Sequence, residues 1–376
     1  MLYQTHIRIH LENIRRNLEG IRKAIGPTRK LLIAVKGNAY GHGAVEVSRM
    51  AQQLELADWL GVATVPEAIS LRQAGVRLPI LKFSPAFSEE MAAAVTNGVT
   101  LAVCEKANIS SLQAVCAALG IRGRVHLKVD TGMGRVGVSP EQAGEMAHFI
   151  EQDCPDLDLE GLFTHLPASD DQAQAAYTGD QITRFKAILA RIETTLGRTL
   201  GLVHCCNSGG VLGHEAGWLS MVRPGIMVYG HYPDESTPRS IPLYPGMSFR
   251  SRISFVKEVA KGTSIGYGRS WTAPEATWIG TLSVGYADGF NRLFSNRGRV
   301  LVNGRSYPVV GRVCMDQTMI DLGPETEVRV GDEVILIGRS GALEITVEEW
   351  AKALGTITYE VTCQINSRVE RIFVRA

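Results

Sequence analysis

Short apolar runs of strand type alternate with stretches of helical period from residue 11 to about residue 240. Residues 11–25 show the helical pattern most clearly, because Leu or Ile recurs there every three or four residues. Further helices are expected at 66–75, 106–120 and 172–196. The apolar runs between the helical stretches lie at 31–35, 59–64, 78–84, 100–104, 125–130, 159–165, 202–207 and 221–230.

This alternation constrains the fold, because consecutive parallel strands need a long crossover connection and a helix is the usual one. About eight strand–helix units over roughly 230 residues fit a closed barrel better than an open doubly wound sheet. We therefore predict an α/β fold whose first part is a TIM-type (β/α)8 barrel.

The pattern changes after about residue 240. Helical periods nearly vanish, and Gly, Asn and Pro turns separate short β-type runs, which predicts a mainly antiparallel β domain. One helix is expected near 347–355, and the segment 231–247, rich in Pro and Ser, is the expected connection. The predicted domains are 1–10, a strand that joins the β domain, 11–240, the barrel, and 241–376, the β domain.

Composition limits the class of function. Of the 376 residues, 45% are hydrophobic and 20% are charged, as in ordinary soluble globular proteins. A formal net charge of +1 gives no electrostatic reason to expect a nucleic acid or an anionic membrane as partner. Small molecules and other protein subunits remain as the expected partners.

The seven cysteines are spaced neither like a disulfide framework nor like a zinc site, so we expect no metal. The first residues lack the apolar core of a signal peptide, and no apolar stretch reaches membrane-spanning length. We therefore expect a cytoplasmic protein.

Lys36 lies where a buried strand meets a glycine-rich loop. It follows the apolar run 31–35 and opens the turn KGNAYGHG at 36–43. Desolvation at the end of an apolar strand lowers the pKa of an ammonium group, which frees the neutral amine that forms a Schiff base. The alternative is an ordinary strand-end lysine that reaches solvent, and on this segment alone that is the more frequent case.

Other polar residues end the neighbouring predicted strands, where catalytic groups gather in barrels of this type, and Arg223 is expected on the last strand. Each has a structural alternative: His165 as a core histidine, Asn207 as a turn former and Arg223 as half of a buried ion pair. Their shared placement on one rim favours a functional site. The residues of this rim are Lys36, Lys128, Asp130, His165, Asn207, Ser208 and Arg223.

Pro224, Gly225 and Ile226 follow Arg223 directly. Glycine lets the backbone approach a ligand closely, and the N–H groups after it can bind a phosphate, as in barrel loops near the last strands. Ser208 can donate from the adjacent loop, and an ordinary turn is the alternative. Walker and Rossmann glycine signatures are absent around this segment, which favours a small phosphorylated cofactor over a nucleotide.

A series of motifs that covers essentially the whole chain resembles the alanine racemase family. The motifs, in chain order, are AVKGNAYGHG at 34–43, DTGMGRVG at 130–137, HCCNSGG at 204–210, VRPGIMVYG at 222–230, GYGRSW at 266–271, GYADG at 285–289, GRVCMDQTMID at 311–321 and TITYEV at 356–361.

The resemblance implies an isomerase that depends on pyridoxal 5′-phosphate (PLP) and binds it in the barrel. It also implies a homodimer whose active sites use residues of both subunits. Lys36 is then the residue that holds PLP as an aldimine and serves as one catalytic base, and Tyr267 of the other subunit is the second base. Arg135 and the backbone near Met315 are the groups expected to receive the substrate carboxylate. Lys128 matches a position that carries a carbamate in many members of the family and so holds the arginine in place.

The resemblance also implies the contacts of the cofactor. Arg223 is the expected partner of the pyridine nitrogen, with His165 bonded behind it. The remaining expected cofactor-binding residues, most of them phosphate contacts, are Tyr40, Asn207, Ser208, Gly225, Ile226 and Tyr359.

The implied reaction is the interconversion of L-alanine and D-alanine by two-base proton transfer on a PLP aldimine, which supplies D-alanine for peptidoglycan. Two groups on opposite faces are needed, because racemisation removes a proton from one face and returns one to the other. The enzyme alternatives are a racemase or decarboxylase of the same fold that acts on serine or on a longer or basic amino acid. Tyr359 and the carboxylate pocket favour a small side chain. A non-catalytic PLP-binding barrel is the other alternative, and the second domain with Tyr267 argues against it.

Overall fold

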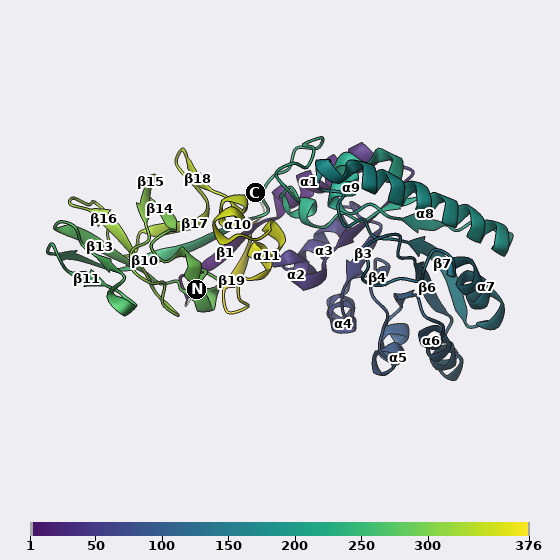
Figure 1. The fold of residues 1–376 in the computed structure, drawn as a ribbon. Helices are drawn as coiled ribbons and strands as arrows, with labels where there is room; N and C mark the ends of the chain where they lie inside the picture. Colours follow the sequence, from purple (N-terminus) through teal and green to yellow (C-terminus); the bar gives the residue numbers. More distant parts are fainter. Residues whose placement is uncertain (1–2, 375–376) are drawn as a thin grey trace. The chain divides into compact units, whose positions relative to one another are not determined.

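The computed structural model describes residues 3–374, which divide into two compact units (Figure 1). Ile14–Tyr244 form one unit, which contains a barrel. The described residues up to Asn13, together with those from Pro245 onward, form the other unit, which consists mainly of β-strands.

Eight strands form the barrel, and each is parallel to its neighbours. The order around the barrel is β8, β7, β6, β5, β4, β3, β2 and β9. The two ends of this order meet where the N–H of Arg223 donates to the carbonyl oxygen of Cys206 at 2.8 Å, so the barrel nearly closes. The strands are β2 Lys30–Ala34, β3 Trp59–Val62, β4 Ile80–Lys82, β5 Val99–Val103, β6 Gly123–Lys128, β7 Leu157–Phe163, β8 Leu202–His204 and β9 Met221–Val222.

Helices connect most of these strands and lie on the outside of the barrel (Figure 1). The predicted α/β barrel is thereby confirmed. The α-helices are α1 Leu11–Ile25, α2 Lys36–Tyr40, α3 Ala44–Gln53, α4 Val65–Gln73, α5 Ser88–Thr96, α6 Lys106–Leu119, α7 Ala143–Asp153, α8 Ala175–Leu196 and α9 Ser208–Gly213, and the 3-10 turns are η1 Gln172–Gln174, η2 Glu215–Gly217 and η3 Ile226–Tyr229.

Most residues of the barrel strands are apolar and buried, as is usual for parallel strands covered by helices, although β6 also carries His126 and β7 carries Asp158 and Glu160. Leu32, Trp59, Leu81 and Met221 come from four different strands and pack in one buried cluster. These four strands are consecutive in the sheet, and the Trp59 ring lies 5.5 Å from the ring of His126 on β6, so the cluster faces the interior of the barrel. The interior is therefore a packed core, and the carboxyl ends of the strands are left to carry polar groups.

The second unit is built on a sheet of nine strands. β1 lies between β10 and β19 in this sheet, antiparallel to the first and parallel to the second, whereas the other pairings are antiparallel. The predicted antiparallel β domain is confirmed. The strands of the sheet are β1 His6–His10, β10 Met247–Val259, β13 Thr277–Leu282, β14 Arg299–Val302, β15 Arg305–Pro308, β16 Thr318–Gly323, β17 Glu333–Ser340, β18 Leu343–Ile345 and β19 Glu370–Val374.

Shorter elements complete this unit. They are the two-stranded sheet of β11 Ser264–Ile265 and β12 Trp271–Thr272, the 3-10 turns η4 Tyr267–Arg269, η5 Tyr286–Asp288 and η6 Arg292–Phe294, and the helices α10 Val347–Leu354 and α11 Thr358–Cys363.

Two local predictions are wrong. The apolar run 221–230 is expected as one strand with Arg223 on it, but β9 ends at Val222, because Pro224 has no N–H for a strand ladder. A second late helix, α11, follows the predicted α10. Its six residues are too few to show a helical period in the sequence.

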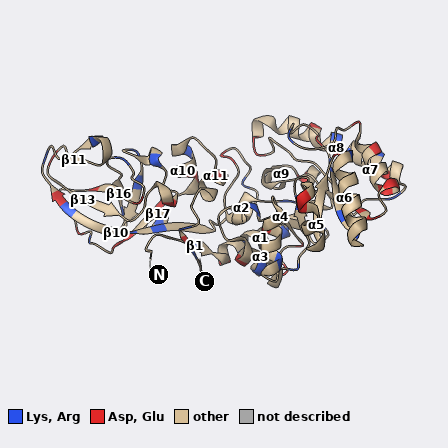
Figure 2. Cartoon of the chain, turned by 90° about the horizontal axis from the view of Figure 1, so that it is seen from below, with Lys and Arg blue, Asp and Glu red and all other residues tan. Residues whose placement is uncertain are grey.

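Basic and acidic residues are interspersed over each unit (Figure 2). No helix of residues 3–374 combines the length and the apolar character needed to cross a bilayer. Within the same residues, no group of three or more His, Cys, Asp or Glu side chains is arranged to hold a metal ion.

Candidate active site

The turn that carries Lys36 is strained. Lys36 follows β2 by two residues and begins α2. Asn38, Ala39 and Tyr40 have φ angles of 53°, 54° and 52°, in the left-handed region, where each residue with a Cβ costs about 1–2 kcal/mol. Backbone strain of this kind collects at functional sites. The turn fixes Lys36 at its start and Tyr40 at its end.

Tyr40 reaches the segment that follows β9. A Cβ on Gly225 would lie 2.5 Å from the hydroxyl oxygen of Tyr40, so a residue without a side chain is needed there. The Ser208 hydroxyl accepts hydrogen bonds from the N–H groups of Gly225 at 2.9 Å and Met227 at 3.4 Å. Ile226 is fully buried, so its side chain belongs to the core. Tyr40, Ser208 and Gly225 are therefore brought together, as predicted for a phosphate site.

Lys128 is a buried cation at the end of β6. Its side chain is 5% exposed, and its Nζ donates to the carbonyl oxygen of Phe83 at 3.0 Å and lies 5.2 Å from the centre of the Phe163 ring. Burial first, and then the charges of Arg223 and Arg135, lower its pKa to about 8. A substantial fraction of this amine is therefore neutral near physiological pH.

Arg223 lies one residue beyond β9 and is almost fully buried. Its guanidinium donates to the carbonyl oxygens of Thr164 at 2.5 Å and Cys205 at 3.0 Å. Its Nε is buried and has no hydrogen-bond partner among residues 3–374. Burial lowers its pKa to about 10, so the group keeps its proton at neutral pH.

The pKa of His165 shows the effect of the positive charges at this rim. This pKa is lowered well below the ordinary value, first by burial and then by Arg223, Arg135, Lys128 and Lys36. Four cations from three strand ends therefore act on one imidazole, which is neutral near pH 7. The bond from His165 to Arg223 stays a prediction, because the bonds described above join Arg223 to backbone oxygens.

The loop that carries Arg135 is wound around one carboxylate. Asp130 accepts hydrogen bonds from the N–H groups of Gly132, Met133, Gly134 and Arg135, at distances of 2.8–3.1 Å. Burial acts to raise the pKa of Asp130, but these four bonds outweigh it and lower the pKa. The backbone of Arg135 is thereby fixed beside the end of β6.

Asn207 caps α9. Its side-chain oxygen accepts from the N–H of Gly210 at 3.0 Å and from the Ser169 hydroxyl at 2.6 Å, and its amide donates to Leu166 at 3.1 Å. These contacts agree with the turn-forming alternative and hold Ser208, the next residue, at the start of the helix. A direct contact of Asn207 with a cofactor stays a prediction.

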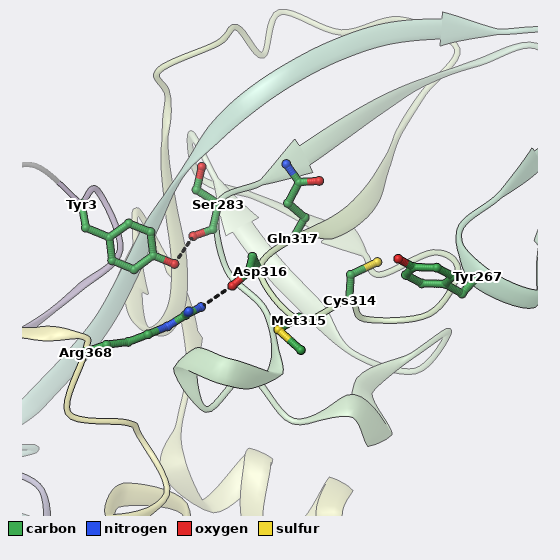
Figure 3. Close-up of a pocket in the computed structure, with 8 residues that line it drawn as sticks. All are labelled: Tyr3, Tyr267, Ser283, Cys314, Met315, Asp316, Gln317 and Arg368. Carbon is green, nitrogen blue, oxygen red and sulfur yellow. Dashed lines mark hydrogen bonds and ion pairs between the residues drawn. The ribbon is translucent and has the colours of Figure 1, made fainter.

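The β unit contains a cavity of about 740 Å³ that Tyr267 and Met315 line (Figure 3). These two residues are 71% and 53% exposed. The cavity is lined by Tyr3, Tyr267, Ser283, Cys314, Met315, Asp316, Gln317 and Arg368.

The backbone of Met315 is held on η5. Tyr286 and Ala287 donate their N–H groups to the carbonyl oxygens of Cys314 and Met315, both at 3.0 Å. A Cβ on Gly285 would lie 2.2 Å from the Met315 oxygen, so this close approach requires glycine. The segment expected to face the substrate carboxylate is therefore rigidly placed within its unit.

The predicted site residues thus fall into two groups. Tyr267, Met315 and Tyr359 belong to the β unit, with Tyr359 on α11. All others belong to the barrel unit and surround the strand ends: Lys36, Tyr40, Lys128, Arg135, His165, Asn207, Ser208, Arg223, Gly225 and Ile226.

Several residues of the rim have no assigned role in the sequence analysis. The rings of Phe83 and Phe163 lie 5.8 and 5.4 Å from the Arg223 guanidinium carbon, within the range of cation–π attraction. An aromatic residue in an apolar strand carries no sequence signal of such a contact. Glu67 is another such residue, because it accepts from the N–H of Gly37 at 2.7 Å. The sequence indicates only its capping role, since Thr64 and Glu67 have the spacing of a helix capping box.

Comparison with known proteins identifies two matching families. "Alanine racemase, N-terminal domain" matches residues 9–233, and "Alanine racemase, C-terminal domain" matches residues 246–373. The alanine racemase of Cutibacterium acnes is 47% identical over 370 residues, which are 98% of this chain and 98% of that protein. The alanine racemase of Chlorobaculum tepidum is 43% identical over 369 residues, 97% of this chain and 94% of that protein. The solved alanine racemase of Clostridium difficile 630 has a TM-score of 0.94 at 36% identity and covers 100% of this chain and 96% of its own.

The buried histidines of the barrel predict a loss of stability in acid. Burial is the first cause that lowers the pKa of His126, His165 and His204 below the ordinary value of 6.5. The unfolded chain therefore binds more protons than the folded one below about pH 6.5, so the free energy of unfolding falls as the pH decreases through that value. Arg223→Met removes the first electrostatic cause for His165 and His204 and should raise both pKa values.

NMR titration of ¹³C-labelled histidine rings measures these pKa values, and denaturant unfolding at pH 5.5 and 7.5 measures the loss of stability. Arg122→Met is the control, because Arg122 is not among the charges that act on either ring. Unchanged titration of both rings in Arg223→Met would contradict the close approach of these charges.

Proposed function

The chain belongs to the alanine racemase family, and from this premise we propose that it interconverts L-alanine and D-alanine with PLP as cofactor. The observation that carries the proposal is the cluster of four cations around the strand ends of the barrel. Such a cluster suits a ligand with two kinds of anion, a phosphate and a carboxylate. PLP bound to an amino acid has both.

The residues of the rim fit PLP. The buried Nε of Arg223 has no hydrogen-bond partner in the described residues and, because the group keeps its proton, can only donate. A pyridine nitrogen is a suitable acceptor for it. Around the phosphate we assign the hydroxyls of Tyr40 and Ser208 and the backbone of Gly225.

The other assigned cofactor contacts are Ile226 through its backbone, Asn207, His165 and Tyr359. Lys36 supplies the amine that binds the cofactor covalently. When bound, PLP supplies an electron sink that makes the α-proton of the amino acid removable. Arg223 keeps its own proton, which leaves the ring nitrogen unprotonated and moderates that sink.

Two groups of the chain handle the proton on opposite faces of the substrate. We assign the Lys36 amine to one face and the Tyr267 hydroxyl to the other, with each acting as acid when its partner acts as base. Tyr267 is 71% exposed within its own unit, so it is available to a second copy of the chain. We therefore propose a homodimer in which Tyr267 comes from the partner subunit.

The substrate carboxylate is assigned to Arg135 and the backbone near Met315. Asp130 fixes the loop of the arginine, and η5 fixes the loop of the methionine. We infer that Tyr359 and this carboxylate site favour a small side chain, in accordance with alanine. The expected setting is the cytoplasm, where D-alanine is supplied for peptidoglycan.

Lys128 is proposed to carry a carbamate. A neutral amine attacks carbon dioxide, forms an N–C bond and releases one proton, and a pKa of about 8 leaves about one amine in ten neutral at pH 7. The negative group so formed would face the charges of Arg135 and Arg223, which lower the pKa of the unmodified amine. Carbamylation would thus replace a positive group by a negative one and remove the repulsion between Lys128 and the two arginines.

Carbamylation of Lys128 predicts a carbamate signal in the ¹³C NMR spectrum of protein kept in ¹³C-bicarbonate. The signal should vanish in Lys128→Met and remain in Lys82→Met. Lys82 is a matched control, because it is also a buried strand-end lysine with a lowered pKa but donates to Ser84 and Pro85. No signal in the unmodified sequence would contradict the proposal.

Purified protein with PLP should convert L-alanine to D-alanine, as measured by chiral chromatography. Lys36→Ala should lower the rate by about a thousandfold or more, because it removes a proton-transfer group together with the covalent anchor. Lys30→Ala is the control, since Lys30 begins β2, the strand that precedes Lys36, and bonds to Asp58. Retained activity in Lys36→Ala would contradict the assignment of Lys36 as covalent anchor and catalytic base.

The shared active site predicts complementation between two inactive variants. Lys36→Ala and Tyr267→Phe chains should each be nearly inactive alone. After mixing and subunit exchange, mixed dimers combine an intact lysine with an intact tyrosine at one of their two sites, and activity should return toward one quarter of the unmodified level. An active Tyr267→Phe variant, or no recovery after exchange, would contradict the assignment.

A further inference from the structure

The strained turn of Lys36 is held by a carboxylate from a neighbouring strand–helix unit. The N–H of Gly37, the residue directly after Lys36, donates to Oε1 of Glu67 at 2.7 Å. Glu67 lies in the first turn of α4, which follows β3. This bond therefore joins the ends of β2 and β3 at the rim.

The second oxygen of Glu67 is also occupied. Oε2 accepts from the N–H groups of Ala63 at 2.8 Å and Thr64 at 3.1 Å, which completes the capping box of α4. One carboxylate thus serves three backbone donors that belong to two different loops. Two acceptor oxygens are needed for this, and only Glu or Asp has them.

The backbone of the turn is strained, so a contact from outside the turn helps to hold its conformation. Its residues Asn38, Ala39 and Tyr40 have positive φ angles, which side chains with a Cβ disfavour. Within the segment, the Asn38 side chain accepts from the N–H of Ala44 at 2.9 Å. Glu67 adds a charged acceptor from outside the segment, at the residue next to Lys36.

We propose that Glu67 is a positioning residue, which holds the left-handed turn so that Lys36 and Tyr40 are presented to the cofactor together. This proposal rests on the proposed function, in which Lys36 binds the cofactor covalently and Tyr40 contacts its phosphate. Glu67 acts on this turn through the backbone N–H of Gly37.

The first measurement is hydrogen exchange of peptides that cover 36–43, made on the protein without cofactor. Glu67→Gln removes the negative charge and replaces one acceptor oxygen by a donor, so the Gly37 N–H loses its charged acceptor whichever way the amide is turned. We expect exchange in this segment to speed up roughly tenfold, as for loss of one bond to a charged acceptor.

The second measurement is the rate at which added PLP forms a borohydride-trapped adduct on Lys36. We expect this rate to fall roughly tenfold in Glu67→Gln, because the amine is no longer held in place. If Glu67→Gln does not fold, Glu67→Asp is used in its place. This variant keeps both oxygens and the charge but is one methylene shorter.

Two control variants separate positioning from helix capping. Thr64→Ala removes the bond from the Glu67 N–H to the Thr64 hydroxyl at 3.3 Å and leaves the Gly37 contact intact. Glu90→Gln alters the corresponding capping residue of α5, which bonds to the Phe87 N–H. Both should leave exchange at 36–43 and adduct formation within about twofold of the unmodified protein.

Unchanged exchange in Glu67→Gln, or equal effects of Glu67→Gln and Thr64→Ala, would overturn the proposal. The two measurements distinguish failure of this proposal from failure of the proposed function. If no adduct forms on Lys36 in the unmodified protein while Glu67→Gln still speeds exchange, the positioning of the turn is supported and the cofactor role of Lys36 is contradicted.

Discussion

The concentration of positive charge at the carboxyl ends of the barrel strands is the constraint on which the rest of the site depends. Lys36, Lys128, Arg135 and Arg223 all act on His165, and together with burial they lower its pKa well below the ordinary value. Burial and the charges of Arg223 and Arg135 also lower the pKa of Lys128 to about 8, and burial lowers the pKa of Arg223 to about 10. A fold that assembles such a cluster is stabilised by a bound anion, which explains why the site suits a phosphorylated cofactor and a carboxylate substrate.

The fold supplies this cluster through backbone contacts more than through direct pairing of side chains. Asp130 holds the loop of Arg135 with four N–H bonds, and Arg223 is anchored on two carbonyl oxygens. The left-handed turn places Lys36 and Tyr40 at the same rim. A rigid backbone at each position holds the cationic side chains close together, although their charges repel one another.

The sequence predicted the architecture because the barrel depends on periodicity, which is a local property. It also predicted which polar residues share the rim, because residues at strand ends of a parallel barrel must meet. It did not predict the end of β9 at Val222 or the short helix α11. A single proline and a helix of six residues are both too short to change a periodic pattern. The contact between Glu67 and Gly37 joins two loops, so the capping pattern of α4 reveals only half of it. The catalytic and cofactor roles stay proposals that rest on family membership and on this geometry.

The central claim is that the amine of Lys36, at the start of the strained turn, is the covalent anchor of the cofactor. Reduction of the PLP-loaded protein with borohydride, followed by mass spectrometry of its peptides, tests this most directly. The account predicts a single labelled peptide that contains Lys36. A label on Lys128, Lys82 or any other lysine, with the Lys36 peptide unlabelled, would contradict it.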